Sequence, residues 1–280
     1  MRIARFSHNG QVSYGLVLSE DGSAADRPAN GNSAAEHDQG QLVVAQLAGH
    51  PFGASADDIT LTGTRFALDE VRLLAPILPS KVVCAGQNYA DHIDEMGAER
   101  PSEPVIFLKP STAVCGPGDP IRRPTGISER VDFEGELAVI IGRLCSEVPA
   151  DRAAEVIFGY TCANDVTARD LQVRDGQWTR AKGFDTFCPL GPWIETGVDP
   201  ANLSLITSLN NEVKQRSTTS LLLHDVPALV AFVSQVMTLI PGDVLLTGTP
   251  AGVGPMDKGD EVSVTIEGIG TLSNPVMDRE

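Results

Sequence analysis

Residues 130–142 place acidic side chains at the start of a segment that is otherwise strongly apolar. Residues 137–141 are all aliphatic, which is typical of a strand buried on both faces. Side chains two residues apart on a strand point to the same face, so Glu134 and Glu136 project together, with Asp132 on that face as well. We therefore expect a buried strand that begins with a group of carboxylates.

Two neighbouring carboxylates repel each other and raise each other's pKa unless a cation lies between them. The pair Glu134 and Glu136 therefore indicates a metal site. Ligands that are all oxygen favour a hard ion, Mg²⁺ or Mn²⁺, over Zn²⁺ or copper. The spacing is equally compatible with a frayed strand entry whose two acids lie in water, and the spacing alone does not choose between these interpretations.

The composition predicts a soluble globular protein that avoids polyanions. The chain has 280 residues, of which 42% are apolar, enough for one large domain or for one large and one small domain. Its 21 basic and 37 acidic residues give a net charge of −16, so nucleic acid and anionic membranes are not expected partners. Any anion-binding site must then be built locally, from a metal, a lysine or backbone N–H groups.

The ends and cysteines of the chain point to the cytoplasm. Residues 1–10 contain charges but no apolar h-region, so we expect no secretory signal. The longest apolar segment, residues 226–240, is too short to span a bilayer. The five cysteines have no CxxC spacing and are expected to be small buried residues.

Turn and strand signals divide the chain into two parts. Residues 1–18 predict two short strands around an Asn-Gly turn, and the Ser-, Asp- and Gly-rich residues 19–40 predict a loop. Residues 41–72 predict a short helix and a strand, and two prolines follow. We place the boundary there, with a small N-terminal domain over 1–72 and a second, larger domain over 73–280.

Five further side chains are candidates for chemistry. His92 and Glu95 lie three residues apart on a predicted helical turn, where a carboxylate can hold an imidazole as a general base, although such pairs are common on ordinary surface helices. Asp165 follows a predicted buried strand and either caps the next helical turn or supplies a third carboxylate. Lys182 has no acidic partner in a clear helix, which is compatible with an inward-pointing side chain. Lys109 ends a predicted strand and could offer a charge to a substrate, although a strand-end lysine that reaches solvent is the simpler interpretation.

Several of these segments, taken in order, resemble the fumarylacetoacetate hydrolase superfamily. The resemblance covers residues 76–277 and is carried by short motifs: G-Q-N-Y-A-D-H at 86–92, F-L-K-P at 107–110, F-E-G-E-L-A-V at 133–139, N-D-V-T-A-R-D-L-Q at 164–172, A-K-G at 181–183 and L-T-G-T-P-A-G-V-G at 246–254. Residues 1–72 are similar, more weakly, to the short N-terminal domain of bacterial members.

The resemblance implies an α+β, mostly β fold: a mixed β-sandwich roll with a small N-terminal α+β domain, usually a homodimer. It implies that Glu134, Glu136 and Asp165 are the metal ligands and that His92 and Glu95 form a dyad on a lid helix. It also implies that Lys182, Gln172 and Thr249 are the polar groups on the substrate side.

One position departs from the pattern of the superfamily. Gln87 stands where acylpyruvases and oxaloacetate decarboxylases of this kind often have an arginine. If that arginine holds a lid or a substrate carboxylate, its replacement affects the identity of the substrate and leaves the metal site unchanged.

The resemblance predicts a metal-dependent enzyme that cleaves a C–C bond of a small 2-oxo acid, by acylpyruvate hydrolysis or oxaloacetate decarboxylation. The second interpretation is an isomerase or hydratase of the 2-hydroxyhepta-2,4-diene-1,7-dioate type, acting in aromatic catabolism. A binding protein that kept the fold and lost the chemistry is a more distant third, because the residues of the dyad and of the ligand set are all present.

Overall fold

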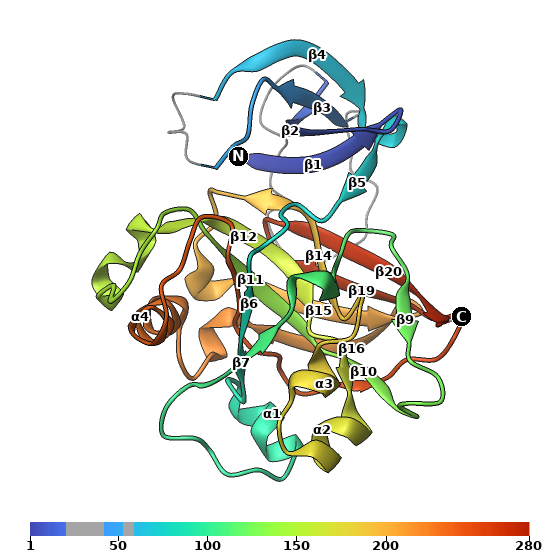
Figure 1. Ribbon diagram of the computed structural model, residues 1–280, viewed down its shortest axis with the longest axis vertical. Coiled ribbons are helices and arrows are strands. Elements are labelled where there is room, and N and C mark those ends of the chain that lie inside the picture. The colour runs from blue at the N-terminus through green and yellow to red at the C-terminus, as the bar shows by residue number, and fades with distance from the viewer. Residues whose placement is uncertain (21–41, 53–58, 280) are drawn as a thin grey trace.

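Strands dominate the computed structural model, which describes residues 1–20, 42–52 and 59–279. Helices α1, α2 and α3 gather at the end of the molecule opposite the N-terminal strands β1–β4, and α4 lies along one side (Figure 1). Among the helices in the described part of the chain, none has the length and apolar character that a membrane span requires. The predicted α+β, mostly β class is confirmed.

One large mixed sheet runs through the whole molecule, in the order β4-β3-β2-β1-β14-β12-β11-β17-β6-β7, with β5 on β1 and β8 on β14. Most neighbouring strands are antiparallel, while β17 and β6 are parallel. Its strands are β1 (Arg2–His8), β2 (Gln11–Ser19), β3 (Leu42–Leu47), β4 (Leu61–Ala67), β5 (Arg72–Leu74), β6 (Val82–Gly86), β7 (Val105–Lys109), β8 (Val114–Cys115), β11 (Gly135–Ile141), β12 (Ile157–Asn164), β14 (Cys188–Glu195) and β17 (Val244–Leu246).

Two smaller sheets and four α-helices complete the fold of the described residues. The five-stranded sheet has the order β16-β15-β19-β20-β9 and packs against β11, β12 and β14, while the three-stranded sheet has the order β13-β10-β18. The elements are β9 (Ile121–Arg123), β10 (Val131–Phe133), β13 (Thr167–Ala168), β15 (Ser204–Leu209), β16 (Glu212–Thr218), β18 (Gly254–Pro255), β19 (Glu261–Ile266), β20 (Gly270–Asp278), α1 (Ala90–Glu95), α2 (Arg169–Asp175), α3 (Thr179–Lys182) and α4 (Val226–Val236).

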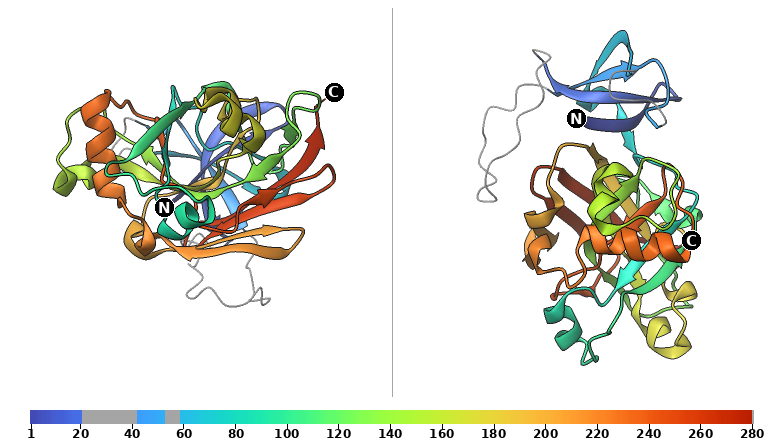
Figure 2. Two further views of the ribbon diagram at one scale, coloured as in Figure 1. Left: turned by 90° about the horizontal axis from the view of Figure 1, so that it is seen from below. Right: turned by 90° about the vertical axis from the view of Figure 1, so that its left-hand side faces the viewer.

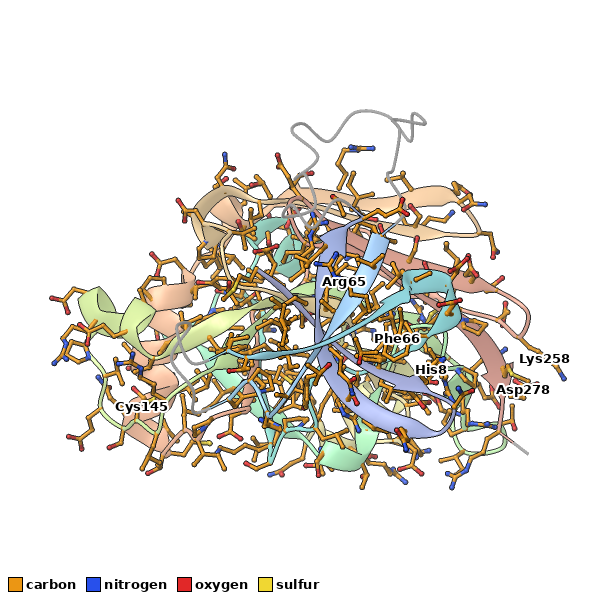
Figure 3. The ribbon with its side chains drawn as sticks, turned by 90° about the horizontal axis from the view of Figure 1, so that it is seen from above. His8, Arg65, Phe66, Cys145, Lys258 and Asp278 are labelled. Carbon is orange, nitrogen blue, oxygen red and sulfur yellow. The ribbon has the colours of Figure 1, made fainter. Side chains whose placement is uncertain are left out.

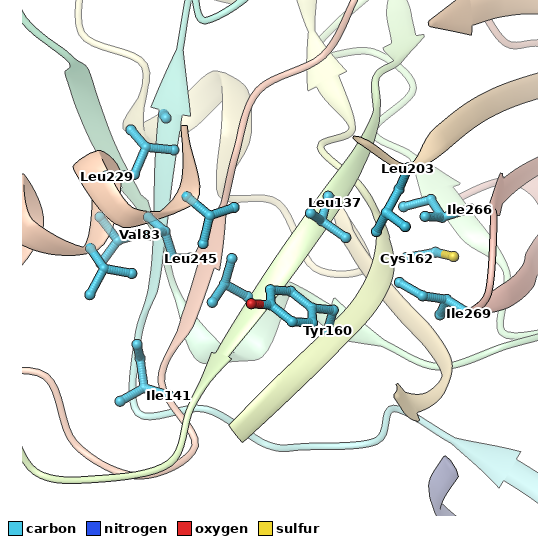
Figure 4. Packing of buried hydrophobic residues seen from close by; sticks show 14 of the residues in the cluster. Val83, Leu137, Ile141, Tyr160, Cys162, Leu203, Leu229, Leu245, Ile266 and Ile269 are labelled. Carbon is cyan, nitrogen blue, oxygen red and sulfur yellow. The ribbon is translucent and has the colours of Figure 1, made fainter. Parts of the chain in front are cut away.

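Strand β11 is buried along its whole length because apolar layers cover both of its faces. Leu137, Val139 and Ile141 enter the core beneath α4 and the five-stranded sheet (Figure 4). Ala138 and Ile140 point the other way, into a second cluster. Each large aliphatic side chain buried in this way contributes roughly 1.5–3 kcal/mol. The predicted strand over 137–141 is thus confirmed, and it fixes the direction of the carboxylates at its start.

The N-terminal strands continue the large sheet and also have a small core of their own. Strand β1 pairs with β14 through Arg2 opposite Glu195 and Ile3 opposite Ile194. The right-hand view of Figure 2 places these strands above the rest of the molecule. The rings of His8 and Phe66 lie on these N-terminal strands, with their centroids 4.4 Å apart (Figure 3).

The predicted helix within 41–72 is wrong for the described residues. Residues 42–47 instead form β3, which pairs with β2 and β4. The described part of the N-terminal region contains strands and one short 3-10 turn, so the expected α+β character is not present there. The loop predicted over 19–40 lies, except for its first two residues, outside the described residues.

Lys109 at the end of β7 connects three segments that surround the pocket described below. Its side chain is fully buried, and Nζ donates to the carbonyls of Val166, Lys182 and Phe187 at 3.0, 2.6 and 2.7 Å. A solvent-reaching lysine was the simpler expectation at a strand end. Here the ammonium instead satisfies three buried carbonyls that β-ladders do not reach.

Replacing Lys109 with Met should therefore destabilise the fold, because it leaves three carbonyls buried without a donor. We expect the free energy of unfolding to fall by about 3–5 kcal/mol in chemical denaturation. The matched control is Lys214→Met, which removes an ammonium that pairs with Glu212 at the surface and should cost less than about 0.5 kcal/mol. Equal midpoints for the two variants would contradict this role for Lys109.

Candidate metal centre and active site

Glu134, Glu136 and Asp165 meet in one buried group at the start of β11. Each offers one carboxylate oxygen, and these oxygens all lie within 4.8 Å of one another. Strand pairing explains the meeting, because Gly135 lies opposite Asn164 on β12 and the Asp165 N–H donates to the Glu134 carbonyl at 2.8 Å. The position of Asp165 beside Glu134 is therefore a direct consequence of the antiparallel register of two long, buried strands.

The glycine between the two glutamates is required by packing. A Cβ at Gly135 would lie 2.0 Å from the hydroxyl oxygen of Thr207. The Gly135 N–H donates to the Gln215 side chain at 2.9 Å, and the Glu134 N–H donates to the Asn164 side chain at 2.9 Å. These bonds fix the backbone that aims both carboxylates into the same space.

Two buried cations balance one side of the carboxylate group. The Lys182 ammonium lies 2.8 Å from Glu134 Oε2 and 2.7 Å from Asp165 Oδ2, and Arg169 donates to Glu134 Oε1 at 2.5 Å. Burial alone would raise the pKa of Glu134, but the charges of Lys182 and Arg169 outweigh it and hold that pKa well below its usual range. Lys182 does point inward, as its lack of a helical partner suggested.

The charges on the other side of the group are compensated less completely. Burial, followed by the neighbouring charges of Asp165 and Glu134, raises the pKa of Glu136 well above its usual value. Its one hydrogen bond within the described residues comes from the Gly248 N–H at 2.6 Å. Asp165 Oδ1 is buried and receives no hydrogen bond; the Lys109 ammonium is 2.7 Å away, but its three protons go to carbonyls.

This donor set fits a hard divalent cation. Three buried carboxylates offer oxygen ligands only, and one of their oxygens, Asp165 Oδ1, receives no hydrogen bond from the described residues. The solvated strand entry, which the spacing left open, does not describe these residues, because each of the three is at most 4% exposed. Asp165 also does not cap α2, whose N-cap is Ala168.

His92 lines the same pocket from α1, and Glu95 contacts the imidazole from outside the pocket lining. His92 Nδ1 lies 3.1 Å from Glu95 Oε2, and Glu95 Oε1 accepts a hydrogen bond from the Gly252 N–H at 3.0 Å. The carboxylate therefore both orients the imidazole and attaches α1 to the loop after β17. An imidazole held in this way is suited to accept and return a proton.

The two predicted substrate-side residues line the pocket but are already engaged by neighbours. The Gln172 carbonyl oxygen accepts from Arg169 at 2.6 Å, and the Thr249 hydroxyl donates to the Gly135 carbonyl at 2.9 Å while it accepts from Gln215 at 2.8 Å. These bonds commit part of their hydrogen-bonding capacity to shaping the site. Their role toward a substrate stays a prediction.

Asp132 shares the buried region but is not part of the carboxylate group. Arg130 and Arg169 bind both of its oxygens, at 2.9–3.1 Å. Sequence reasoning did not single out Arg169, although the residue lies inside the quoted T-A-R-D run four positions after Asp165. An arginine at a strand-to-helix junction beside three acids is the signal that could have identified it.

The pocket enclosed by these groups is small. Its volume is about 220 Å³, below the roughly 300–1,000 Å³ of sites for drug-sized ligands. All eight predicted site residues except Glu95 line it, together with Gln87, Phe107, Trp178 and Val173 among others. A compact organic acid suits this volume.

A mostly β protein with a carboxylate site beside a histidine dyad is the class that the fold and the pocket define. The Fumarylacetoacetate (FAA) hydrolase C-terminal family matches residues 81–277, and the Rv2993c-like N-terminal family matches residues 1–76. The chain belongs to the fumarylacetoacetate hydrolase family.

Known relatives cover most or all of the chain. A solved 2-hydroxyhepta-2,4-diene-1,7-dioate isomerase from Mycobacterium marinum is 52% identical over 100% of this chain and 99% of its own, with a TM-score of 0.86. The mitochondrial oxaloacetate tautomerase Fahd2a of Rattus norvegicus is 44% identical over 74% of this chain and 70% of its own. Maleylpyruvate hydrolase from Sphingobium sp. SYK-6, solved with manganese(II) and pyruvate, is 29% identical over the full length of both chains, with a TM-score of 0.76. Members of the family are enzymes.

Replacing Glu136 with Gln should weaken Mn²⁺ binding by at least about 100-fold. The amide oxygen can still accept from the Gly248 N–H, so the change removes chiefly one negative charge. Mn²⁺ affinity is measured by titration calorimetry, with the exposed Glu155→Gln as the control. Because Glu136 repels its neighbours, the metal-free variant should melt no lower than the parent. Unchanged Mn²⁺ affinity would remove Glu136 from the ligand set.

Proposed function

We propose that the protein is a divalent-metal-dependent enzyme that cleaves a C–C bond of a small 2-oxo acid, by acylpyruvate hydrolysis or oxaloacetate decarboxylation. The observation that carries this proposal is the small pocket in which three buried carboxylates lie beside His92, whose imidazole Glu95 holds from outside the lining. The carboxylates are suited to hold a cation, and the imidazole is suited to move a proton.

Glu134, Glu136 and Asp165 would hold Mg²⁺ or Mn²⁺. The ion, when bound, supplies Lewis acidity that draws electrons from a 2-oxo acid. The manganese complex of maleylpyruvate hydrolase supports this choice of ion. Lys182, 2.7–2.8 Å from two of the three carboxylates, adds a fixed positive charge where an enolate oxygen develops.

In acylpyruvate hydrolysis, the imidazole of His92 accepts a proton from a water molecule that attacks the distal carbonyl carbon. The bond between that carbon and C3 then breaks, and its electron pair remains on the pyruvate fragment as an enolate. His92 returns the proton to C3, so the products are pyruvate and a carboxylic acid. Glu95 keeps the ring oriented and stabilises its charged form. In oxaloacetate decarboxylation no water attacks, and His92 serves only to deliver a proton.

Isomerisation of a 2-hydroxyhepta-2,4-diene-1,7-dioate is the second candidate. The 52% identity to an isomerase of that name favours it, and the tautomerase relative shows that proton movement alone is a reaction of this family. The same residues serve each case, because all of them pass through an enolate. We also propose that the protein acts as a homodimer, which sedimentation analysis would test.

Assays with Mg²⁺ and Mn²⁺ against acetylpyruvate, fumarylpyruvate, oxaloacetate and the dienedioate in parallel test the proposal. His92→Asn should lower acylpyruvate hydrolysis by roughly 10²–10⁴-fold and lower oxaloacetate decarboxylation far less, because only hydrolysis needs an activated water. Mn²⁺ binding should be retained. Asp94→Asn, an exposed change on the same helix, is the control.

If the protein turns over the dienedioate alone and releases no pyruvate from any substrate, its function is isomerisation and the proposal of C–C cleavage is wrong. An equal loss of hydrolysis and decarboxylation in His92→Asn would contradict the role given to that residue.

A further inference from the structure

The two ends of the pocket differ in chemical character. The inner end contains the three carboxylates, and both cationic side chains that line the pocket, Arg169 and Lys182, bind Glu134 there. The rest of the lining in the described residues is dominated by carbon: Ala85, Met96, Ala98, Phe107, Val173 and Trp178. A substrate that places its 2-oxo acid group at the inner end extends its other arm along this apolar part.

A continuous aromatic wall leads from the inner end to the opening. Lys182 Nζ lies 5.0 Å from the centre of the Phe107 ring, and the Phe107 ring meets the edge of Trp178 at a centroid distance of 5.2 Å. Trp178 in turn packs on Gly86, where an added Cβ would lie 2.7 Å from the indole. The wall therefore ends beside Gln87, a neutral and partly exposed side chain.

Two aliphatic side chains at the pocket are left exposed to water. Val173 on α2 is 78% exposed and Met96 beside α1 is 42% exposed, and both line the pocket. An isolated exposed apolar residue needs no explanation. Val173 on α2 and Met96 just after α1 both line one pocket, beside the aromatic wall. Together they form a surface that an apolar group would cover.

Nearby cations outside the lining are paired with acids. Arg174 and Arg180 both bind Asp175, at 3.4 and 2.6 Å, and Arg100 lies 4.0 Å from Asp94. The net charge of −16 adds no general attraction for anions. A second carboxylate on the substrate would lose water against the aromatic wall without gaining a partner, which is costly.

We propose that the substrate is an acylpyruvate whose arm beyond the distal carbonyl is uncharged and apolar, an alkyl or aryl group that packs on Phe107, Trp178, Val173 and Met96. The proposal rests on the proposed function and narrows it, because it favours monoanionic acylpyruvates over dioates. Oxaloacetate has no arm beyond its distal carboxylate and does not reach this surface.

Two probes that differ only at the far end test the proposal. They are 2,4-dioxoheptanoate, which ends in a methyl group, and 2,4-dioxoheptanedioate, which ends in a carboxylate. With the Mn²⁺-loaded protein, kcat/KM for the methyl probe should exceed that for the carboxylate probe at least ten-fold. Each probe is also titrated into Mn²⁺-loaded His92→Asn protein, so that the preference is read as a ratio of Kd values whether or not a bond is cleaved.

Matched variants test whether the preference for the methyl probe arises at the opening of the pocket. Val173→Lys and Gln87→Arg each add a cation and should raise kcat/KM for the carboxylate probe at least ten-fold. Val173→Gln and Gln87→Met change the side chains without adding charge and should not improve the carboxylate probe. Both positions are exposed or partly exposed, so the variants are expected to fold.

The outcomes separate this proposal from the proposed function. A preference for the methyl probe in Kd without any cleavage would overturn C–C cleavage and leave the apolar arm standing. Cleavage of both probes with equal efficiency, or with a preference for the carboxylate probe, would overturn the apolar arm and leave cleavage standing. If Val173→Lys and Gln87→Arg do not raise kcat/KM for the carboxylate probe, the proposal of an apolar arm is also overturned.

Discussion

The pairing of β11 with β12 is the constraint on which the site depends. It places Asp165 across from Glu134 and buries both strands between apolar layers. Three acids held this close in a dry place repel one another, and Lys182 and Arg169 offset only part of that repulsion. The protein thus holds negative charge in a fixed position, which is the property that a cation-binding site requires.

The features that could be predicted from the sequence are local ones. The aliphatic run at 137–141 and the spacing of Glu134 and Glu136 follow from the two-residue period of a strand, and His92 and Glu95 follow from the helical period. The meeting of Asp165 with the two glutamates needed the resemblance to a family, because no local period relates residues 29 positions apart. The domain boundary at residue 72 stays a prediction.

The features that sequence reasoning missed depend on partners distant in the chain. Lys109 was interpreted as a lysine that reaches solvent, since nothing near it in sequence shows that three carbonyls converge on its ammonium. The helix predicted within 41–72 is wrong in the described residues, because pairing with β2 and β4 holds residues 42–47 as a strand. In both cases tertiary contacts decided the local structure.

Strand β1 pairs with β14 over a short stretch, and this affects how easily the N-terminal strands could be gained or lost in related proteins. Only two residue pairs join the N-terminal strands to β14 in the main ladder, while β14 keeps its own pairing with β12. Gain or loss of the N-terminal unit in a lineage would therefore disturb little of the hydrogen bonding that supports the acids.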